Sequence, residues 1–187
     1  MNVIWRTLLV FWRSRRRHRR DGDVDVRSVG RIRLTTLPTD LDLMRHMNNG
    51  RYLSLFDLGR FDMLVRTGIW DVMSRNGWYP VIANQTITYR KSLHPWQRFD
   101  VETRVVAADE RAVYIEHRAV VDGEIYAEAA VRGRFLRRSG GVLRMAEMFE
   151  AIGQDPASVP APEPWMTRWA EDVALPPTKA PAPSVWT

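Results

Sequence analysis

The chain carries, at residues 40–53, the stretch Asp40-Leu41-Asp42-Leu43-Met44-Arg45-His46-Met47-Asn48-Asn49-Gly50-Arg51-Tyr52-Leu53. This stretch places two carboxylates, an imidazole and two carboxamides directly before an apolar segment. Asparagine is typical of helix starts, because its side chain accepts hydrogen bonds from the free N–H groups there. We therefore expect a helix to begin at residues 48–50, with an acid close to N–H groups that stabilise a developing negative charge.

The segment after this start has the pattern of a buried helix. Apolar residues dominate from Tyr52 to Val65, while polar side chains recur at every third position from Arg51 to Arg60. This pattern predicts a helix that is covered around most of its circumference and stops at Gly68. Shorter helical segments are expected at 70–75, ending near Gly77 and Pro80, and at 143–152.

Alternating apolar and polar residues predict strands both before and after the long helix in the sequence. Before it, Ile32 and Leu34 alternate with Arg31 and Arg33. After it, the same period of two recurs at 81–89, 99–105, 113–119 and 125–133. The dipeptide Asp122-Gly123 between the last two runs is the favoured type I′ hairpin signal. The order predicts an α+β fold, in which a curved antiparallel five-stranded sheet wraps around one long helix.

Composition limits both the domain count and the partners. The 187 residues are enough for one domain with a full core, and we expect an apolar and basic leader at 1–22, a domain at 23–153 and a tail at 154–187. The net charge of +6 belongs to one end, because residues 1–20 contain seven arginines and no acid. A near-neutral remainder argues against nucleic-acid binding. The absence of cysteine excludes disulfides, thiolate metal sites and a cysteine nucleophile.

The two ends allow different interpretations. The leader runs from an apolar stretch at 1–12 to a basic one at 13–20, which suits an interfacial membrane anchor or, alternatively, a disordered leader without a partner. Twelve helical residues span about 18 Å, too short for a bilayer core of about 30 Å. The tail has eight prolines from Pro156 to Pro183, so we expect it to lack regular structure, with Trp165, Trp169 and Trp186 available for contacts.

The stretch at residues 40–53 resembles a family motif. Asp-x-Asp-x-x-x-His-x-Asn-Asn-Gly-x-Tyr-Leu is similar to the loop before the central helix in hotdog-fold acyl-CoA thioesterases of the 4-hydroxybenzoyl-CoA thioesterase type, and closest to the thioesterase-superfamily member 6 branch. The resemblance runs from about Arg31 to Arg138 and implies a hotdog fold, an acyl-CoA substrate and a homodimer, or a dimer of dimers, with the active site at the subunit interface. It also implies that Asp42 is the catalytic carboxylate and that His46 orients it or transfers a proton. In the similar plant acyl-carrier-protein thioesterases, a catalytic asparagine stands where this chain has Met44.

The residues themselves support a candidate site. Thioester hydrolysis needs a carboxylate that attacks the carbonyl or activates water, together with donors for the oxyanion. We assign these roles to Asp42, His46, Asn49 and Gly50, and we assign substrate contacts to Tyr52, Asp57, Arg90 and Lys91, with Arg134 as a further cation for phosphates.

Each residue also has a structural interpretation. Asp40 fits a turn after Pro38, Asn48 and Asn49 fit helix caps, and His46 fits a loop histidine. Asp57 fits an exposed stripe or a pair with Arg60 or Arg51, and Arg90, Lys91 and Arg134 fit surface cations. The remaining histidines, His18, His94 and His117, lack ligand spacing, so we expect no metal and no cofactor.

Three functions remain open from the sequence. The first is an acyl-CoA thioesterase that releases free acid and CoA. The second is a non-catalytic acyl-thioester or lipid-binding protein at a membrane surface, which the missing asparagine at Met44 favours. The third is an acyl-carrier-protein thioesterase. We expect a cytoplasmic protein, with peripheral membrane contact if residues 1–20 act as an anchor.

Overall fold

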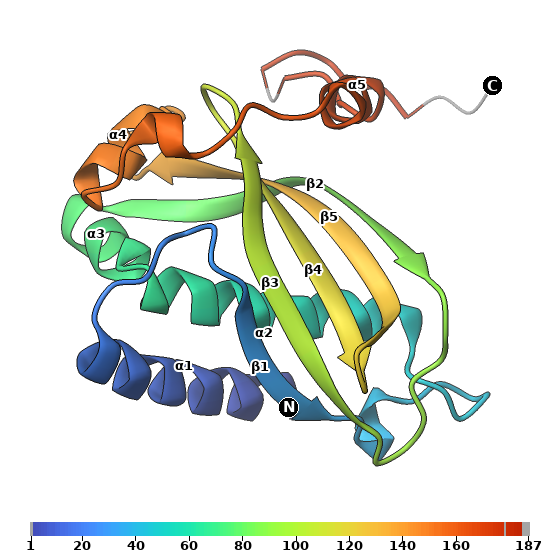
Figure 1. Cartoon of the computed structure of the whole chain (residues 1–187). Coiled ribbons are helices and arrows are strands. Elements are labelled where there is room, and N and C mark those ends of the chain that lie inside the picture. The colour runs from blue at the N-terminus through green and yellow to red at the C-terminus, as the bar shows by residue number, and fades with distance from the viewer. Residues whose placement is uncertain (1, 178, 185–187) are drawn as a thin grey trace.

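The computed structural model describes residues 2–177 and 179–184. Across these residues a five-stranded antiparallel sheet wraps around a central helix, α2 (Asn49–Arg66) (Figure 1). The strands lie in the order β1-β3-β4-β5-β2 and comprise β1 (Gly30–Thr35), β2 (Trp78–Tyr89), β3 (Arg98–Ala108), β4 (Val113–Val121) and β5 (Glu124–Arg137). This arrangement confirms the predicted hotdog fold.

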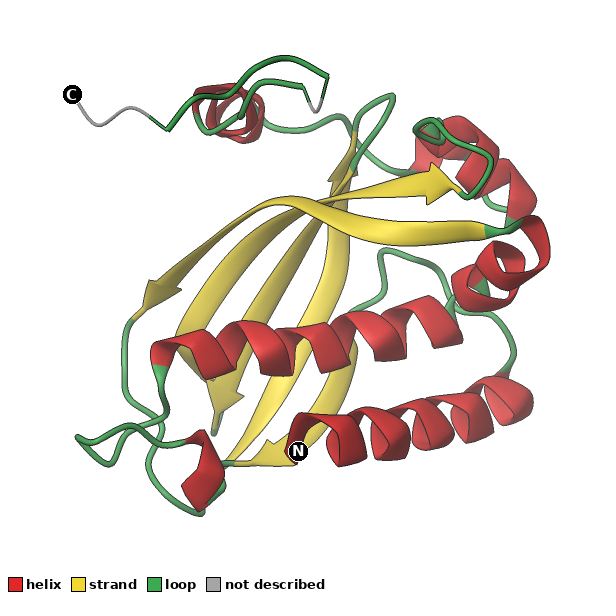
Figure 2. Cartoon of the chain, turned by 180° about the vertical axis from the view of Figure 1, so that it is seen from behind, coloured by secondary structure: helices red, strands yellow, loops and turns green. Residues whose placement is uncertain are grey.

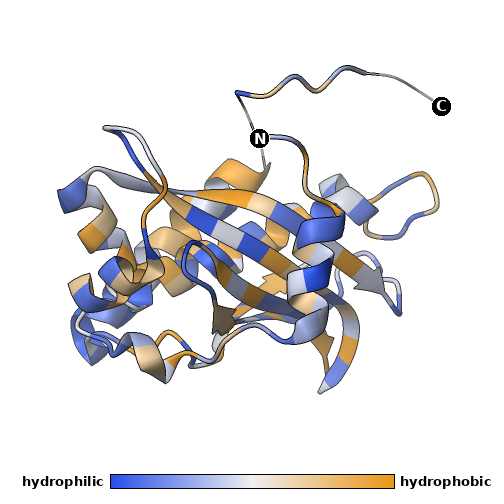
Figure 3. Ribbon diagram, turned by 90° about the horizontal axis from the view of Figure 1, so that it is seen from above, coloured by the Kyte–Doolittle hydropathy of each residue, from blue (hydrophilic) through white to orange (hydrophobic). Residues whose placement is uncertain are grey.

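The period of two in the strands decides which side chains face α2. In β3, Phe99, Val101, Thr103 and Val105 are buried, whereas Arg104 is exposed. Figure 3 shows the resulting alternation of hydrophobic and hydrophilic residues along the strands. The predicted hairpin at Asp122-Gly123 is confirmed, since both residues have the positive φ that a type I′ turn requires, 48° and 83°.

Helix α2 begins and ends where the sequence predicts. The Asn48 side chain accepts from the Gly50 amide at 2.9 Å and caps the start. Gly68, with φ of 74°, separates α2 from α3 (Ile69–Asn76), and Gly77 ends α3 in the same left-handed conformation. At Gly59 the helix approaches the sheet so closely that a Cβ would overlap the Thr103 hydroxyl. Leu55, Phe56 and Leu58 fill the space around this contact.

Strand β2 starts earlier than the sequence predicts. It includes Pro80, which was expected to mark the end of the preceding helical segment. A proline has no N–H to donate, but β2 is the outer strand beside β5, so one of its edges needs no partner within the chain.

Residues 2–21 of the leader form helix α1 (Asn2–Asp21). Of the two interpretations of the leader, the disordered one therefore does not describe these residues. Helix α1 runs beside α2 on the side away from the sheet (Figure 2). Val10 and Ser14 face α2 and are 6% and 1% exposed. The apolar and basic residues at this end therefore form a structured part of the fold.

The C-terminal segment also contains more structure than expected. Helix α4 (Met145–Ala151) confirms the helix expected at 143–152. The proline-rich tail, expected to be irregular, forms a 3₁₀ turn at Pro156–Ser158 and helix α5 (Pro164–Asp172). Proline is tolerated in α5 because Pro164 occupies its first position, where no N–H bond is needed. Met166 of α5 packs against Ala107 and Tyr114, while Trp186 lies outside the described residues.

Candidate active site

The loop between β1 and α2 folds back on itself before the helix starts. After a 3₁₀ turn at Pro38–Asp40, Leu41 and Met47 form an antiparallel bridge. Within it the Asp42 amide donates to the His46 carbonyl at 2.9 Å, and the Arg45 amide donates to the Asp42 carbonyl at 3.1 Å. Asp42 therefore stands at the base of a tight turn whose tip, at Leu43 and Met44, is exposed.

The Asp42 carboxylate is half-buried and held by its own turn. One oxygen, Oδ1, accepts from the Met44 amide at 2.9 Å and from the His46 amide at 3.3 Å. No described residue donates to the other oxygen, which leaves it available for a substrate or a water molecule. Two backbone donors on one oxygen fix the orientation of the group without neutralising its charge.

Asp40 lies in the 3₁₀ turn after Pro38, as expected for a turn residue, and it also makes contacts beyond that turn. Its side chain is fully buried and lies between two arginines, with Arg51 donating to Oδ1 at 3.1 Å and Arg6 of α1 lying 3.0 Å from Oδ2. The Leu37 amide donates to Oδ2 at 2.9 Å, and the Asp40 carbonyl accepts from the Asn48 amide. Asp40 thus fastens the loop, the start of α2 and α1 together.

The N-terminus of α2 offers fewer amides than the sequence suggested. The Gly50 amide donates to the Asn48 side chain, and the Arg51 amide donates to the Asn48 carbonyl at 2.9 Å. No described residue accepts from the Asn49 amide. Among the first three N–H groups of the helix, Asn49 therefore provides the donor that can meet an oxyanion.

The end of β2 and the segment that follows it lie against this helix start. The Tyr89 hydroxyl donates to the Asn49 carbonyl at 3.0 Å, and its ring lies edge-on to Tyr52, with centroids 5.3 Å apart. The Tyr52 hydroxyl accepts from the Leu93 amide, and Tyr52 is buried, which raises the pKa of its phenol. The His94 ring stands edge-on to His46 at 5.0 Å. Tyr89 and His94 were not assigned to the site, because their proximity depends on the return of the chain after β2.

The side chains of Arg90 and Lys91 pair with a residue outside the group formed by Asp42, His46, Tyr52, Tyr89 and His94. Both are exposed, and both pair with Glu124, at 3.1 Å and 2.5 Å respectively. Glu124 begins β5, so the pairing follows from the antiparallel contact between β2 and β5. Their charges are already partly neutralised, which weakens the assignment of these two residues to substrate phosphates.

A second group of polar residues lies further along α2. Asp57 pairs with Arg60, and the Arg60 guanidinium lies 2.9 Å from Nε2 of His117 on β4. The other ring nitrogen of His117 lies 2.9 Å from the Thr103 hydroxyl of β3. His117 is fully buried and stacks on Phe56 with centroids 5.2 Å apart. This chain of contacts connects the half-exposed Asp57 to the interior of the sheet.

Burial, together with the charge of Arg60, holds the pKa of His117 well below its usual 6.5. The histidine is therefore neutral in the folded chain, whereas in the unfolded chain it gains a proton as the pH falls through about 6.5. Because the unfolded state then binds more protons, the free energy of unfolding decreases below that pH. We expect a loss of up to about 1 kcal/mol between about pH 6.5 and pH 5.5 from this residue.

Urea unfolding at about pH 7.5 and about pH 5.5 measures this effect. His117→Asn, which keeps a polar side chain but no titrating ring, is expected to show a smaller difference between the two conditions. An equal pH dependence in both proteins would contradict the assignment.

A mainly apolar cavity opens beside Asp57, between α2 and strands β2, β4 and β5. Its walls are formed by Phe61, Met63, Leu64, Pro80, Val81, Ile82, Val113, Ile115, Gly133 and Phe135, with Asp57, Arg60 and Arg134 as its polar members. The Nε atom of Arg134 is buried and lacks a hydrogen-bond partner among the described residues. Such a cavity suits an apolar group that carries a polar or anionic end.

Comparison with known proteins places the chain in a family. The sequence model of the thioesterase-like superfamily matches residues 36–170, which include the loop, α2 and the whole sheet after β1. The chain therefore belongs to the thioesterase-like superfamily.

Among particular relatives, protein THEM6 of Xenopus laevis is 40% identical over 98 residues, covering 52% of this chain and 47% of that protein. Protein THEM6 of Danio rerio is 38% identical over 102 residues, covering 54% and 50%. The chain thus spans about half the length of the curated relatives that it matches.

Solved structures share the fold at low sequence identity. The probable thioesterase YbaW of Escherichia coli has a TM-score of 0.61 and 18% identity, over 65% of this chain and 97% of that one. The DHNA-CoA thioesterase of Staphylococcus aureus has a TM-score of 0.60 and 17% identity, over 67% and 89%. These matches bear out the hotdog architecture.

Proposed function

We propose that the protein is an acyl-CoA thioesterase that uses Asp42 as its catalytic carboxylate. The observation that carries this proposal is the orientation of the Asp42 side chain. It lies in the loop directly before α2, two backbone amides hold one of its oxygens, and no described residue donates to the other. Membership of the thioesterase-like superfamily supports the same reaction class. A relative named as a probable thioesterase, from Saccharomyces cerevisiae and 26% identical over 86 residues, agrees with it.

Asp42 can act in two ways. As a general base, it removes a proton from water while the water oxygen attacks the thioester carbon; the C–S bond then breaks, and the proton passes to the departing CoA thiolate. As a nucleophile, the carboxylate itself attacks, displaces the thiolate and forms an acid anhydride that water hydrolyses in a second step. In both routes the carbonyl oxygen becomes negative and accepts a hydrogen bond from the Asn49 amide.

Neighbouring residues complete the proposed site. His46 lies in the same turn as Asp42 and supports it through its amide, and its ring contacts His94. Gly50 has no side chain, which leaves room for a thioester next to the Asn49 amide. The cavity beside Asp57 receives the acyl group, and the buried Tyr52 side chain packs at the helix start. Arg90 and Lys91 remain candidates for the CoA phosphates, in competition with Glu124.

A homodimer is the second part of the proposal. Strand β2 has one edge without a partner in the described chain, and it exposes Tyr79, Ile82 and Tyr89. Unpaired edges with apolar side chains favour pairing with another strand. Pairing of β2 with the same strand of a second copy would bring a second subunit next to Tyr89 and the start of α2.

Release of CoA from a panel of aliphatic and aromatic acyl-CoA thioesters tests the function. We expect hydrolysis of at least one class, with the same panel on an acyl-carrier protein turned over more slowly. Tight binding of acyl-CoA without any turnover would instead select the non-catalytic binding protein. Faster turnover of carrier-bound thioesters would select the carrier-protein thioesterase.

A further inference from the structure

Helix α1 is fastened to the domain by one face only. Ser14 donates to the buried Asp62 of α2 at 2.5 Å, and Arg17 lies 4.0 Å from the same carboxylate. Arg6 donates to the Thr35 carbonyl of β1 at 2.6 Å, and Arg15 pairs with Asp71 of α3 at 2.9 Å. The contacts are distributed along the helix, so α1 is held at both ends.

The opposite face of α1 is apolar over its first half. Ile4, Trp5, Leu8, Leu9 and Trp12 recur at helical spacing on this outer face and are 65%, 72%, 55%, 45% and 54% exposed. Nothing in the described chain covers these five side chains. Exposure of this much apolar surface on one helix face is unfavourable in free energy in water. We call these five residues the outer stripe.

The second half of the same face is basic. Arg13, Arg16 and Arg19 have no carboxylate partner among the described residues, and Arg20 pairs only with its neighbour Asp21. The Arg16 guanidinium lies over the Trp12 ring at 4.8 Å, where the apolar and basic halves meet. The seven arginines of this end thus divide in their contacts. Arg6, Arg15 and Arg17 hold the helix on the domain, Arg13 is exposed at the groove between α1 and β1, and Arg16, Arg19 and Arg20 are exposed.

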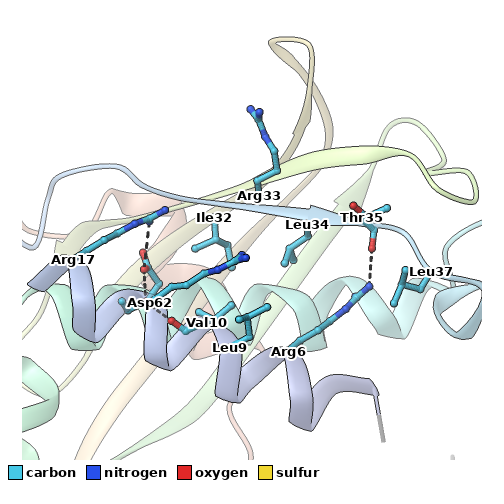
Figure 4. A pocket seen from close by; sticks show the side chains of 12 residues that line it. Arg6, Leu9, Val10, Arg17, Ile32, Arg33, Leu34, Thr35, Leu37 and Asp62 are labelled. Carbon is cyan, nitrogen blue, oxygen red and sulfur yellow. Dashed lines mark hydrogen bonds and ion pairs between the residues drawn. The ribbon is translucent and has the colours of Figure 1, made fainter.

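A groove beside the outer stripe extends the apolar surface. It lies between α1 and the edge strand β1, where Leu9 and Val10 approach Ile32 and Leu34 (Figure 4). Arg6 and Arg17 close its two ends through the β1 carbonyls of Thr35 and Arg31. Arg33 points away from the groove (Figure 4), toward Asp100 on the outer surface.

We propose that α1 docks the protein on an anionic lipid bilayer, with the outer stripe inserted among the lipids and Arg13, Arg16 and Arg19 at the headgroup phosphates. The helix lies along the surface, because its inner face and its ion pairs to Asp40, Asp62 and Asp71 stay on the domain. Within the described residues, no helix combines the length and apolar character needed to cross a bilayer. Apolar insertion and cationic attraction act together on this helix, as they do in interfacial helices.

Sedimentation of the full chain with vesicles tests the docking. One set of vesicles contains phosphatidylcholine alone, and the other contains phosphatidylcholine mixed with phosphatidylserine. We expect stronger binding to the mixed vesicles and weaker binding at high salt. Trp5→Ser with Trp12→Ser should reduce binding to both vesicle types, roughly 100-fold on the mixed ones. The triple replacement of Arg13, Arg16 and Arg19 by Gln should remove most of the preference for phosphatidylserine, also roughly 100-fold.

Matched variants elsewhere on the surface provide the controls. Trp96→Ser with Trp165→Ser removes two other exposed tryptophans, and Gln at Arg75, Arg98 and Arg111 removes three other exposed arginines. Both sets should bind vesicles like the unchanged chain. Equal pelleting of the outer-stripe variants and these controls would overturn the proposal. A change of oligomeric state in the Trp5 and Trp12 variant, without a change in vesicle binding, would instead assign the stripe to contact with a second copy of the chain.

The docking does not depend on the proposed reaction. Hydrolysis of a water-soluble short-chain acyl-CoA should be the same in the outer-stripe variants and in the unchanged chain. Loss of vesicle binding with retained hydrolysis separates the two proposals.

Discussion

Asp42→Asn is expected to lower the turnover number for acyl-CoA hydrolysis roughly 10²–10⁴-fold, as removal of a general base does in other enzymes. The substitution tests the charge specifically, because the carboxamide oxygen can still accept from the Met44 and His46 amides and the turn keeps its shape. What it removes is the charge and the basicity of the free oxygen. Steady-state kinetics with the best substrate of the panel, together with circular dichroism and a urea unfolding curve, measure the effect.

Asp57→Asn is the matched control for this variant. Asp57 is also an acid near α2, its side chain is half exposed, and it lies at the apolar cavity. We expect this variant to keep most of the turnover, with any change mainly in the apparent affinity for substrate. If Asp42→Asn retains full turnover while Asp57→Asn loses it, the catalytic carboxylate lies on the helix and the proposed mechanism is wrong.

Asp40→Asn is expected to lower the free energy of unfolding by about 3 kcal/mol, the low end of the range for a broken buried ion pair. The carboxylate is fully buried and faces Arg6 and Arg51, which are themselves mostly shielded from water. An amide supplies no compensating charge, and its NH₂ group would face a donor at either oxygen position. Arg6 would also lose its hold on the loop, so the N-terminal part of α1 should become more susceptible to proteolysis.

The comparison for Asp40 is Asp71→Asn, which removes the acid of another α1 ion pair. Arg15 and Asp71 are both about one-third exposed, so water screens the pair and its contribution is below about 1 kcal/mol. Chemical unfolding of the two variants in parallel isolates the effect of burial. Similar losses in both would show that the buried ion pairs of Asp40 contribute no more to stability than the exposed pair of Asp71.

Several elements could be predicted because their signals are local. Asn48 caps α2 through a hydrogen bond two residues away, Gly68 supplies the left-handed backbone that ends the helix, and Asp122-Gly123 closes a hairpin between adjacent strands. Alternation in β1 and β3 follows from the pleat itself. These features depend on neighbours within a few residues, so the sequence around them contains the necessary information.

The candidate site could be predicted only in part. The turn at Asp42 and His46 lies within one short loop, and its motif identifies it. The sequence alone did not indicate that Glu124 pairs with Arg90 and Lys91, or that Tyr89 and His94 reach the loop. Each of these contacts joins segments that only the folded sheet brings together.

The sequence by itself determined the positions of α2, the turns and the five strands apart from the early start of β2, since backbone propensity and hydrophobic period act over short distances. Tertiary structure alone decided the partners of the buried charges: Asp40 between Arg6 and Arg51, Asp62 beneath Ser14, and His117 between Arg60 and Thr103. It also divided the arginines of α1 into an inner and an outer set. A charge enters the interior only where a partner from another segment lies within reach, and that proximity arises from the packing of α1 and the sheet around α2.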